Sequence, residues 1–430
     1  MGQADQAAAA AQERGRQQLS PIPPTVNAER LHGRLAALSH CGRTAAGGVT
    51  RLAYSDADRE ARALVMDWMR EAGLAPSVDF AGNIIGRRAG ADASRGPLLF
   101  GSHVDSVPDG GNYDGPLGTL AAIETAAVIA EQGRALRHPI EVVVWSNEEG
   151  GLFGSRAVSG QLPVRELQNV SRSGKTVADG IASIGGDPAR LDEIQREPGA
   201  IAGYLELHIE QGAILEQSHT DIGVVEGIVG LREWNVTITG AANHGGTTPM
   251  DERRDALLSA ARFIEMVNRV VRSVPGHQVG TVGRIEATPG AVNAIAGLVV
   301  CSLELRDLDT AKIDSLFARI RGEARRIGES DGTTFAFADL MTGAPAPSDP
   351  RMREAIAQSA DALGLSWRAM PSGAGHDAQA MATLGPMGMI FVPSVGGISH
   401  SPREYSTPEA VVNGANVLLG ALLAADRELP

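Results

Sequence analysis

The sequence predicts an α/β fold in which a discontinuous first domain, with a mostly parallel sheet covered by helices, is interrupted by an inserted α+β domain. Three observations support this expectation. The chain has 430 residues, which exceeds one ordinary hydrophobic core. Strands that are apolar on both faces alternate with helices in its first part. From about residue 231 the strands alternate apolar and polar residues, as strands with one solvated face do.

The first domain begins with a clear helix over residues 55–71. Ser55 and Asp58 resemble a capping box at its start, and Gly73 ends it. A short strand at 97–100, a helix near 116–132 and an apolar strand at 140–145 follow. This β, α, β order predicts a parallel sheet, and reactive groups in such sheets gather beyond the carboxyl ends of the strands.

The inserted domain is expected to contain antiparallel strands and helices. Trp234, Val236 and Ile238 alternate with polar residues in one strand, and a later strand at 299–306 has the same pattern. Thr248-Pro249 is expected to open a helix between them. The apolar face predicted for this helix consists of Leu257, Ala261, Ile264, Val267 and Val271.

The α/β pattern resumes after a linker rich in Gly and Pro at 343–347. A helix from about 350 and a strand at 389–392 follow. We therefore expect a disordered or loosely ordered leader at 1–25, a first domain made of 26–230 and 344–430, and an inserted domain at 231–343.

Composition excludes several classes of protein. Apolar residues make up 43% of the chain and charged residues 21%, which is typical of a globular protein, and the net charge of −13 argues against a nucleic-acid-binding surface. Cys41 and Cys301 lie in no C-x-x-C pattern. No uninterrupted run of about 18 apolar residues predicts a membrane span. The leader does not resemble a secretory signal, which favours the cytoplasm, although a removed export signal would also permit the periplasm.

Five short motifs carry the chemistry, and each contains Gly or Ser where a strand is expected to end. They mix carboxylate and imidazole side chains, a set that suits zinc, manganese, cobalt or nickel. The motifs are G-S-H-V-D-S (101–106), G-G-N-Y-D-G (110–115), W-S-N-E-E-G-G (145–151), E-L-H-I-E-Q-G (206–212) and G-G-I-S-H-S-P-R-E (396–404).

These residues predict a centre for two divalent metal ions, which needs a bridging carboxylate and further ligands on each side. Asp114 is the natural bridge. His103 and His208 could complete one site, and Glu149 and His400 the other. Glu148 would then remain unligated as the general base, and Asp105 could accept the ring N–H of His103.

Each residue also has a simpler interpretation. A single histidine is more often a surface or hydrogen-bonded core residue than a ligand, and Glu148-Glu149 could belong to a solvated loop. The metal centre is favoured because five such motifs occur together and the intervening chain supplies the strands that would unite them.

The motifs resemble those of the co-catalytic metallohydrolases related to aminoacylases and dimetal carboxypeptidases. Within that group the chain is most similar to N-carbamoyl-L-amino-acid hydrolases, β-ureidopropionases and allantoate amidohydrolases, over residues 30–425. The resemblance implies the same metal ligands and the same base, Glu148. The histidine in H-I-E-Q-G, His208, is typical of the ureido-cleaving branch.

The resemblance also implies residues that contact the substrate. Gln211 is expected to contact it, and His244 to reach the neighbouring subunit's site and stabilise an oxyanion. Asn293 and Arg306 resemble a clamp for the substrate carboxylate. The loop S-G-A-G-H-D-A-Q is expected to offer the Gly375 amide and the His376 side chain. A turn histidine at 244 and a surface arginine at 306 are the simpler alternatives.

The expected activity is hydrolysis of the linear ureido C–N bond of N-carbamoyl amino acids or related ureido acids, with two divalent ions per subunit and a homodimer formed through the inserted lid domain. A dimetal aminoacylase or peptidase acting on N-acyl amino acids is the alternative, and a catalytically silent relative is opposed by the complete ligand set. Neither nucleic acid nor membrane is an expected partner. After N-E-E-G the chain reads G-L-F-G-S-R (151–156), where the resembling enzymes have Arg-Phe, which leaves the subfamily open.

Overall fold

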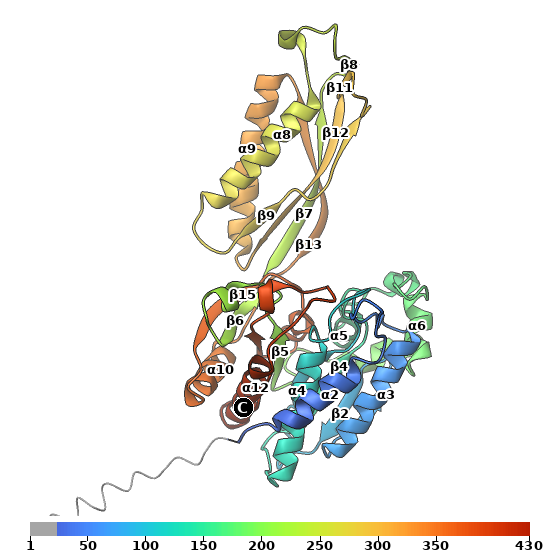
Figure 1. Ribbon diagram of the computed structural model, residues 1–430, viewed down its shortest axis with the longest axis vertical. Coiled ribbons are helices and arrows are strands. Elements are labelled where there is room, and N and C mark those ends of the chain that lie inside the picture. Colours follow the sequence, from blue (N-terminus) through green and yellow to red (C-terminus); the bar gives the residue numbers. More distant parts are fainter. Residues whose placement is uncertain (1–23) are drawn as a thin grey trace, which may run out of the picture.

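The computed structural model describes residues 24–430, so the leader predicted at 1–25 lies almost wholly outside the described residues. The chain forms two bodies stacked along its long axis (Figure 1). The smaller body is one continuous segment, residues 230–343, which we call the insert. The larger body, which we call the main body, is built from the residues on either side of it.

Within residues 24–430, the sheet of the main body has the order β1-β2-β4-β3-β5-β16-β6-β14, and β15 also pairs with β6. The central strands β4, β3, β5 and β16 run parallel to one another. The pairs β1-β2, β2-β4, β16-β6 and β14-β6 are antiparallel. The expected mixed α/β fold with a mostly parallel central sheet is therefore confirmed. The strands are β1 Ala75–Val78, β2 Ile84–Arg88, β3 Leu98–His103, β4 Ile140–Trp145, β5 Gly203–Ile209, β6 Ile222–Ile228, β14 Ala346–Pro347, β15 Trp367–Ser372 and β16 Met387–Val392.

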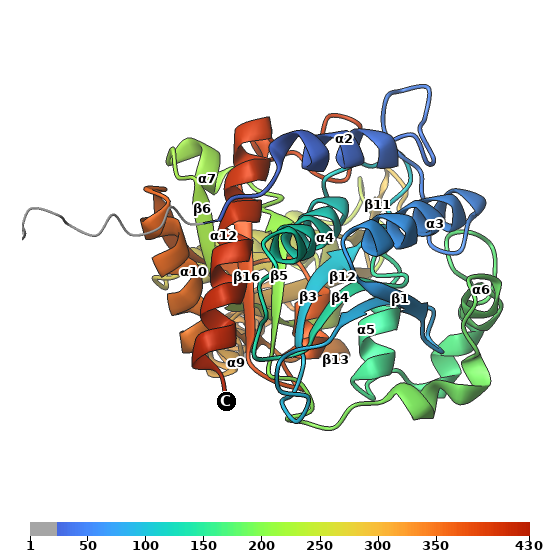
Figure 2. The same cartoon turned by 90° about the horizontal axis from the view of Figure 1, so that it is seen from below.

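Helices cover both faces of this sheet, which explains why every residue of β3, β4, β5 and β16 is buried. Figure 2 shows α2, α3, α4, α10 and α12 lying across one face. Helices α5 and α11 pack against the other face. The helices of the main body are α2 Ala28–Leu38, α3 Asp56–Glu71, α4 Pro116–Glu131, α5 Phe153–Val158, α6 Val177–Ser183, α7 Ile214–Gln217, α10 Pro350–Ala362, α11 Asp377–Met381 and α12 Pro408–Glu428, with short 3-10 turns η1 Val164–Gln168, η2 Pro188–Ile194 and η4 Val395–Gly397.

Two helices of the main body test particular expectations. The Ser55 hydroxyl accepts a hydrogen bond from the Asp58 backbone N–H at 3.2 Å, so the predicted cap of α3 is confirmed. Among the described residues, α12 is the one helix that is long and apolar enough to span a membrane, although polar residues interrupt its apolar sequence. In this structure 67% of its most apolar window is buried.

The insert is a twisted antiparallel sheet with two helices on one face (Figure 1). Its strand order is β10-β12-β7-β13, with β9 on β12 and a separate β11-β8 pair. Trp234, Val236 and Ile238 are buried as predicted. The elements are β7 Gly230–Thr239, β8 Asn243–His244, η3 Met250–Glu252, α8 Ala256–Arg272, β9 Val279–Thr281, β10 Ile285–Thr288, β11 Ala294–Ile295, β12 Leu298–Asp307, α9 Thr310–Asp331 and β13 Thr334–Gly343.

The expectations for α8 and for the linker were partly wrong. Helix α8 begins at Ala256, not at Thr248-Pro249, because the Asp255 carboxylate accepts hydrogen bonds from two N–H groups of its first turn. Its buried face includes Phe263 and Val267, whereas Leu257, on the predicted face, is 45% exposed. Part of the predicted linker is ordered as strand, since β13 runs to Gly343 and β14 follows.

Candidate metal centre

The sheet brings the five motifs to one edge. Strand β3 ends at His103, β4 ends three residues before Glu148, and β5 carries His208 next to its last residue. Asp114 lies just before α4, and His400 follows β16. Because β3, β4, β5 and β16 are parallel neighbours, their carboxyl ends coincide and these side chains meet there.

Two groups of possible metal ligands share Asp114: His103 with His208, and Glu149 with His400. Oδ1 of Asp114 lies 3.1 Å from Nε2 of His208 and 3.6 Å from Nε2 of His103. Its Oδ2 lies 3.3 Å from Nε2 of His400, and that nitrogen is 3.4 Å from Oε1 of Glu149. One carboxylate thus faces both groups, which is the arrangement of a bridging ligand.

The two buried histidines are oriented to offer a lone pair to a cation. Nδ1 of His103 is 3.0 Å from the backbone carbonyl of Asp105, and Nδ1 of His208 is 2.9 Å from its neighbour Ile209's carbonyl. Because a carbonyl only accepts, Nδ1 carries the hydrogen in both rings and Nε2 is free to bind metal. Nε2 of His103 is buried without a hydrogen-bond partner among the described residues, so the donor set fits a metal ion.

Asp105 acts differently from the prediction. Its backbone carbonyl, not its carboxylate, contacts the His103 ring, and its Oδ1 lies 3.7 Å from Nδ1. The carboxylate instead accepts hydrogen bonds from the backbone N–H groups of Glu148 and Glu149, at 3.3 and 3.2 Å. Asp105 therefore holds the turn that presents both glutamates.

The electrostatics of the cluster favour positive charge at its centre. Burial, reinforced by neighbouring carboxylates, raises the pKa of Glu148 well above its usual range, and burial with Asp114 raises the pKa of Glu149 to about 7. Burial would lower the pKa of His103, but Glu148 and other carboxylates raise it overall. Burial would raise the pKa of Asp114, yet the surrounding histidines hold it well below the usual value. Acidic groups crowded in this way are stabilised by a bound cation.

Sequence reasoning missed two residues that hold Asp114. The Glu404 carboxylate accepts hydrogen bonds from the N–H groups of Tyr113 and Asp114, at 2.9 and 3.1 Å. The Ser399 hydroxyl lies 2.9 Å from Oδ2 of Asp114 and 2.9 Å from Glu404. Both residues belong to the motif around His400, so their position in that motif was the available signal.

Glu206 is a further buried acid behind the centre. Its carboxylate accepts hydrogen bonds from the Ser102 and Tyr204 hydroxyls, at 2.8 and 3.0 Å, and from the Ala378 N–H at 3.1 Å. With His208 and His376 it forms a third group whose ligand atoms lie within 4.8 Å of one another. Because these hydrogen bonds occupy both carboxylate oxygens, we interpret Glu206 as part of the scaffold that fixes β5.

Two of the residues predicted to contact substrate lie at this centre. Nε2 of Gln211 donates a hydrogen bond to Oδ2 of Asp114 at 2.7 Å, and Gln211 adopts a left-handed backbone conformation with φ of 57°. The His376 ring is buried, and its centroid lies 4.5 Å from that of the His208 ring. Its Nε2 lies 2.9 Å from the Ser372 hydroxyl. Gly375, on the same loop, is exposed.

The insert residues lie elsewhere. Arg306 forms a two-point ion pair with Glu304, at 2.7 and 2.9 Å, and donates to the Gly373 carbonyl at 2.8 Å, so it reaches the loop of His376. His244, in β8, and Asn293, just before β11, lie at the end of the insert remote from the main body (Figure 1). The His244 Nδ1 accepts from the Gly246 N–H at 3.0 Å. One chain alone therefore does not bring His244 or Asn293 to the metal centre.

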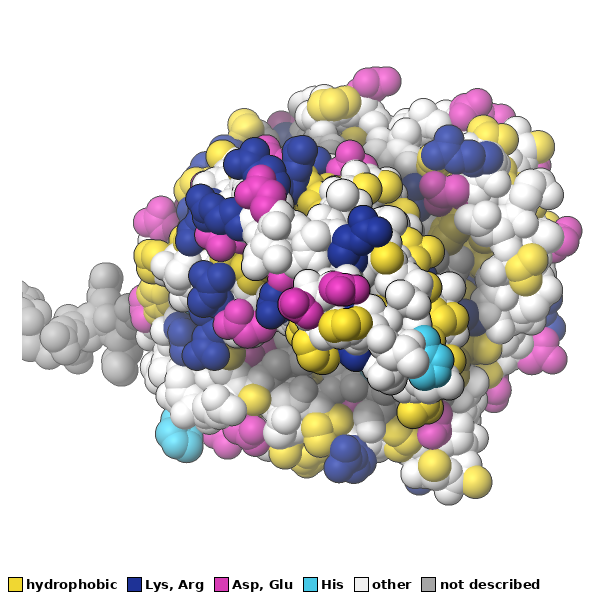
Figure 3. Space-filling view, turned by 90° about the horizontal axis from the view of Figure 1, so that it is seen from above, with side chains coloured by type: hydrophobic (Ala, Val, Ile, Leu, Met, Phe, Trp, Pro, Cys, Tyr) yellow, Lys and Arg dark blue, Asp and Glu magenta, His cyan; other side chains and the backbone are white. Residues whose placement is uncertain are grey.

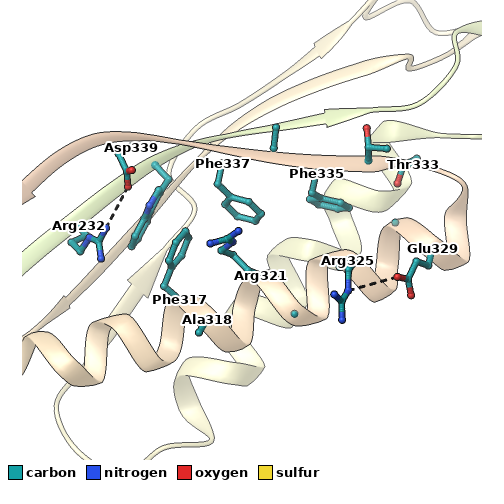
Figure 4. A pocket seen from close by; sticks show the side chains of 15 residues that line it. Arg232, Phe317, Ala318, Arg321, Arg325, Glu329, Thr333, Phe335, Phe337 and Asp339 are labelled. Atoms are coloured by element: carbon teal, nitrogen blue, oxygen red, sulfur yellow. Dashed lines mark hydrogen bonds and ion pairs between the residues drawn. The ribbon is translucent and has the colours of Figure 1, made fainter.

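A cavity of about 930 Å³ lies in the insert, between α9 and β13 (Figure 4). Arg232 and Arg325, at its rim, pair with Asp339 and Glu329 at 3.4 and 3.6 Å. No group of metal ligands within residues 24–430 lines it. On the end face of the molecule seen in Figure 3, basic and acidic side chains are intermixed, without a basic stripe of the kind that binds nucleic acid.

Comparison with known proteins agrees with this geometry. The family model "Peptidase family M20/M25/M40" matches residues 99–424. An N-carbamoyl-L-amino acid amidohydrolase of Geobacillus stearothermophilus is 41% identical, over 91% of this chain and 97% of that protein. One from Pseudomonas sp. (strain NS671) is 38% identical, over 93% and 98%. The crystal structure of an amidase of the hydantoinase/carbamoylase family from Burkholderia multivorans has a TM-score of 0.87 and 37% identity, covering 95% of this chain and all of that one. The chain therefore belongs to the peptidase M20/M25/M40 family.

Proposed function

We propose that this protein is a metal-dependent hydrolase that cleaves the linear ureido C–N bond of an N-carbamoyl amino acid or a related ureido acid. One observation carries the proposal: Asp114 is shared by two groups of metal ligands beside an unligated glutamate, Glu148. The relatives named N-carbamoyl-L-amino acid amidohydrolases, which match nearly the whole chain, support the ureido substrate.

The proposed ligands divide into two sites. His103, Asp114 and His208 would hold one ion, and Asp114, Glu149 and His400 the other. When bound, two ions from the set of zinc, manganese, cobalt and nickel would lower the pKa of water and polarise the carbonyl. The His400 side chain is 50% exposed, whereas those of His103 and His208 are 1% exposed, so substrate is expected to approach from the His400 side.

Glu148 is the proposed general base and acid. Its Oε2 lies 3.7 Å from Nε2 of His103, so it borders the site without belonging to either ligand group. It accepts the proton of the water that attacks the ureido carbon and delivers it to the leaving nitrogen. The carbamic acid released with the amino acid then breaks down to ammonia and carbon dioxide.

We further propose that residues 26–230 and 344–430 form the catalytic domain and that 231–343 form a lid. Arg306 in the insert contacts the loop that carries Gly375 and His376, which lies beside His208. With Gln211, these residues would hold and orient the substrate. A substrate carboxylate would compete with Glu304 for the Arg306 guanidinium, which makes the same two-point contact with either group.

A homodimer formed through the insert would complete the site. The insert exposes large apolar side chains on α8, on β10 and in neighbouring segments, and β10 is an edge strand. They are Met250, Leu257, Leu258, Ile285, Val292 and Leu298. Such a surface favours a protein partner, and a second copy would bring its own His244 and Asn293 toward the metal centre of the first. His244 would then stabilise the oxyanion, and Asn293 would bind the substrate carboxylate.

The experiment is a substrate panel on the full chain, freed of metal and reloaded in turn with Mn, Co, Ni or Zn. The proposal expects ammonia release from N-carbamoyl-L-amino acids and none from the metal-free protein. Release of a carboxylic acid from N-acetyl amino acids, without ammonia from any N-carbamoyl compound, would instead establish the aminoacylase alternative.

A further inference from the structure

A cavity of about 480 Å³ lies directly beside the metal centre and has no role in the mechanism above. One wall is the turn of Asn147, Glu149 and Gly150, so a proposed metal ligand opens onto it. The opposite wall is formed by residues 169–172. Its volume is within the range of about 300–1,000 Å³ that holds small molecules, and the proposed metal ligand Glu149 is part of its lining.

Residues 169–172 of this wall belong to a hairpin that backbone hydrogen bonds close. Val170 forms a bridge with Thr176, and the Ser171 N–H donates to the Lys175 carbonyl at 2.8 Å. The Lys175 ammonium donates to the Tyr54 carbonyl at 2.5 Å, which fixes the hairpin to the buried cluster below it. The tip residue, Arg172, is therefore held on the cavity by ordered backbone.

The lining has one free positive charge. Phe153 and Val170 supply apolar surface, Asn169 and Ser171 supply polar groups, and Arg172 is the only basic residue among them. The nearby Arg156 pairs with Glu166 at 2.9 Å, whereas Arg172 forms no ion pair within residues 24–430. Of the lining residues, Phe153 belongs to the G-L-F-G-S-R segment.

We propose that this cavity receives the side chain of the substrate's amino acid and that Arg172 selects side chains that carry a carboxylate. The inference rests on the proposed function, since it specifies which ureido acids the same centre cleaves. Arg172 is exposed, so its guanidinium can meet a bound side chain. It binds a carboxylate at two points and gains strength from the charge, a contact that an alkyl side chain cannot make. Val170 and Phe153 would contact the methylene groups between that carboxylate and the ureido carbon.

The test compares kcat/KM for N-carbamoyl-L-aspartate, N-carbamoyl-L-glutamate and N-carbamoyl-L-alanine in the metal-loaded wild type, Arg172→Gln and Arg165→Gln. Arg165 is the matched control. It is an exposed arginine in η1, in the same segment between β4 and β5, and it does not line the cavity. Both substitutions change the net charge equally. We expect the wild type to prefer an acidic substrate and Arg172→Gln to lower the acidic-to-alanine ratio of kcat/KM about tenfold, as the loss of one charge-assisted contact does. Arg165→Gln should leave the ratio unchanged.

The outcomes separate this inference from the proposed function. If the wild type releases ammonia from N-carbamoyl amino acids but Arg172→Gln keeps the wild-type ratio, or Arg165→Gln lowers it equally, the side-chain assignment is wrong and the function stands. If the wild type prefers the alanine compound, the assignment is also wrong. If it releases ammonia from none of the three but does so from another ureido acid, the side-chain assignment is wrong and the proposed function stands; if it releases ammonia from no ureido acid, both proposals fail.

Discussion

Gly115 offers a sharp test of the metal centre, because its replacement would disturb one ligand and leave the rest of the fold in place. It lies between Asp114 and the first residue of α4, with φ of 81°. A Cβ at this position would lie 2.4 Å from Cε1 and 2.5 Å from both nitrogens of the His103 ring. Comfortable contacts are roughly 3.5 Å, so in Gly115→Ala the ring must move by about 1 Å.

Such a shift exceeds what a metal ligand tolerates, since ligand distances are held to within about 0.2 Å. We expect Gly115→Ala to lose the ion of the His103 group and to lower kcat at least about 100-fold, the cost of misplacing a catalytic group by about 1 Å. The backbone at Gly115, with φ of 81° and ψ of −58°, is one that L side chains rarely adopt and adds about 1–3 kcal/mol of strain, so the variant should fold with a reduced melting temperature.

The assay is metal content per chain by inductively coupled plasma mass spectrometry, together with kcat for ammonia release. The matched control is Gly133→Ala, which follows α4 at its other end, has φ of 59° and has no atom within 4 Å of the added Cβ. The control should retain both ions and full kcat. A Gly115→Ala protein with wild-type metal content and kcat would refute the placement of His103.

Three further predictions concern the base, the dimer and stability. Glu148→Gln should lower kcat by about 10²–10⁴-fold while metal content stays at the wild-type level, and an active variant would exclude this residue as the base. Mixing His244→Ala with Glu148→Gln protomers should restore about a quarter of the wild-type sites if the histidine acts across the dimer, and no recovery would place the whole site in one subunit. Asp58 is buried, and burial raises its pKa to about 6. The folded state therefore binds this proton more tightly than the unfolded chain, whose pKa is about 4, and the free energy of unfolding falls by about 3 kcal/mol as pH rises from about 4 through 6. Asp58→Asn should remove this pH-dependent loss. The free energy of unfolding of the variant, measured with urea, should therefore rise relative to that of the wild type over this pH interval. A constant difference between the two free energies would show that Asp58 titrates normally.

The α/β architecture was predictable because the central strands are apolar along their whole length. Strands of this kind need helices on both faces, and their carboxyl ends share one edge, so the residues that follow β3 and β4 were expected to meet. His400 follows the strand predicted at 389–392 and obeys the same rule, whereas Asp114 lies just before α4 and its placement was predicted from its motif and from the resemblance.

Other features could not be read from the chain because they depend on neighbours distant in sequence. Leu257, Ala261 and Ile264 of α8 recur with helical spacing yet are not buried, because periodicity alone cannot distinguish their side of the helix from the one that packs in the core. The contact of Asp105 with the Glu148-Glu149 turn crosses 43 residues, and that of Glu404 with Asp114 crosses 290. The pairing of Arg306 with Glu304 differs from these contacts, because it is local: strand β12 places residues i and i+2 on one face, so strand periodicity could have indicated it.

The central claim is that Asp114 joins two metal sites in one chain, and the number of ions per chain at saturation tests it most directly. Full-length protein, dialysed against excess Mn or Zn and freed of loosely bound metal, is predicted to retain two ions per chain, and His400→Ala is predicted to retain one. Saturation of the wild type at a single ion per chain would contradict the account.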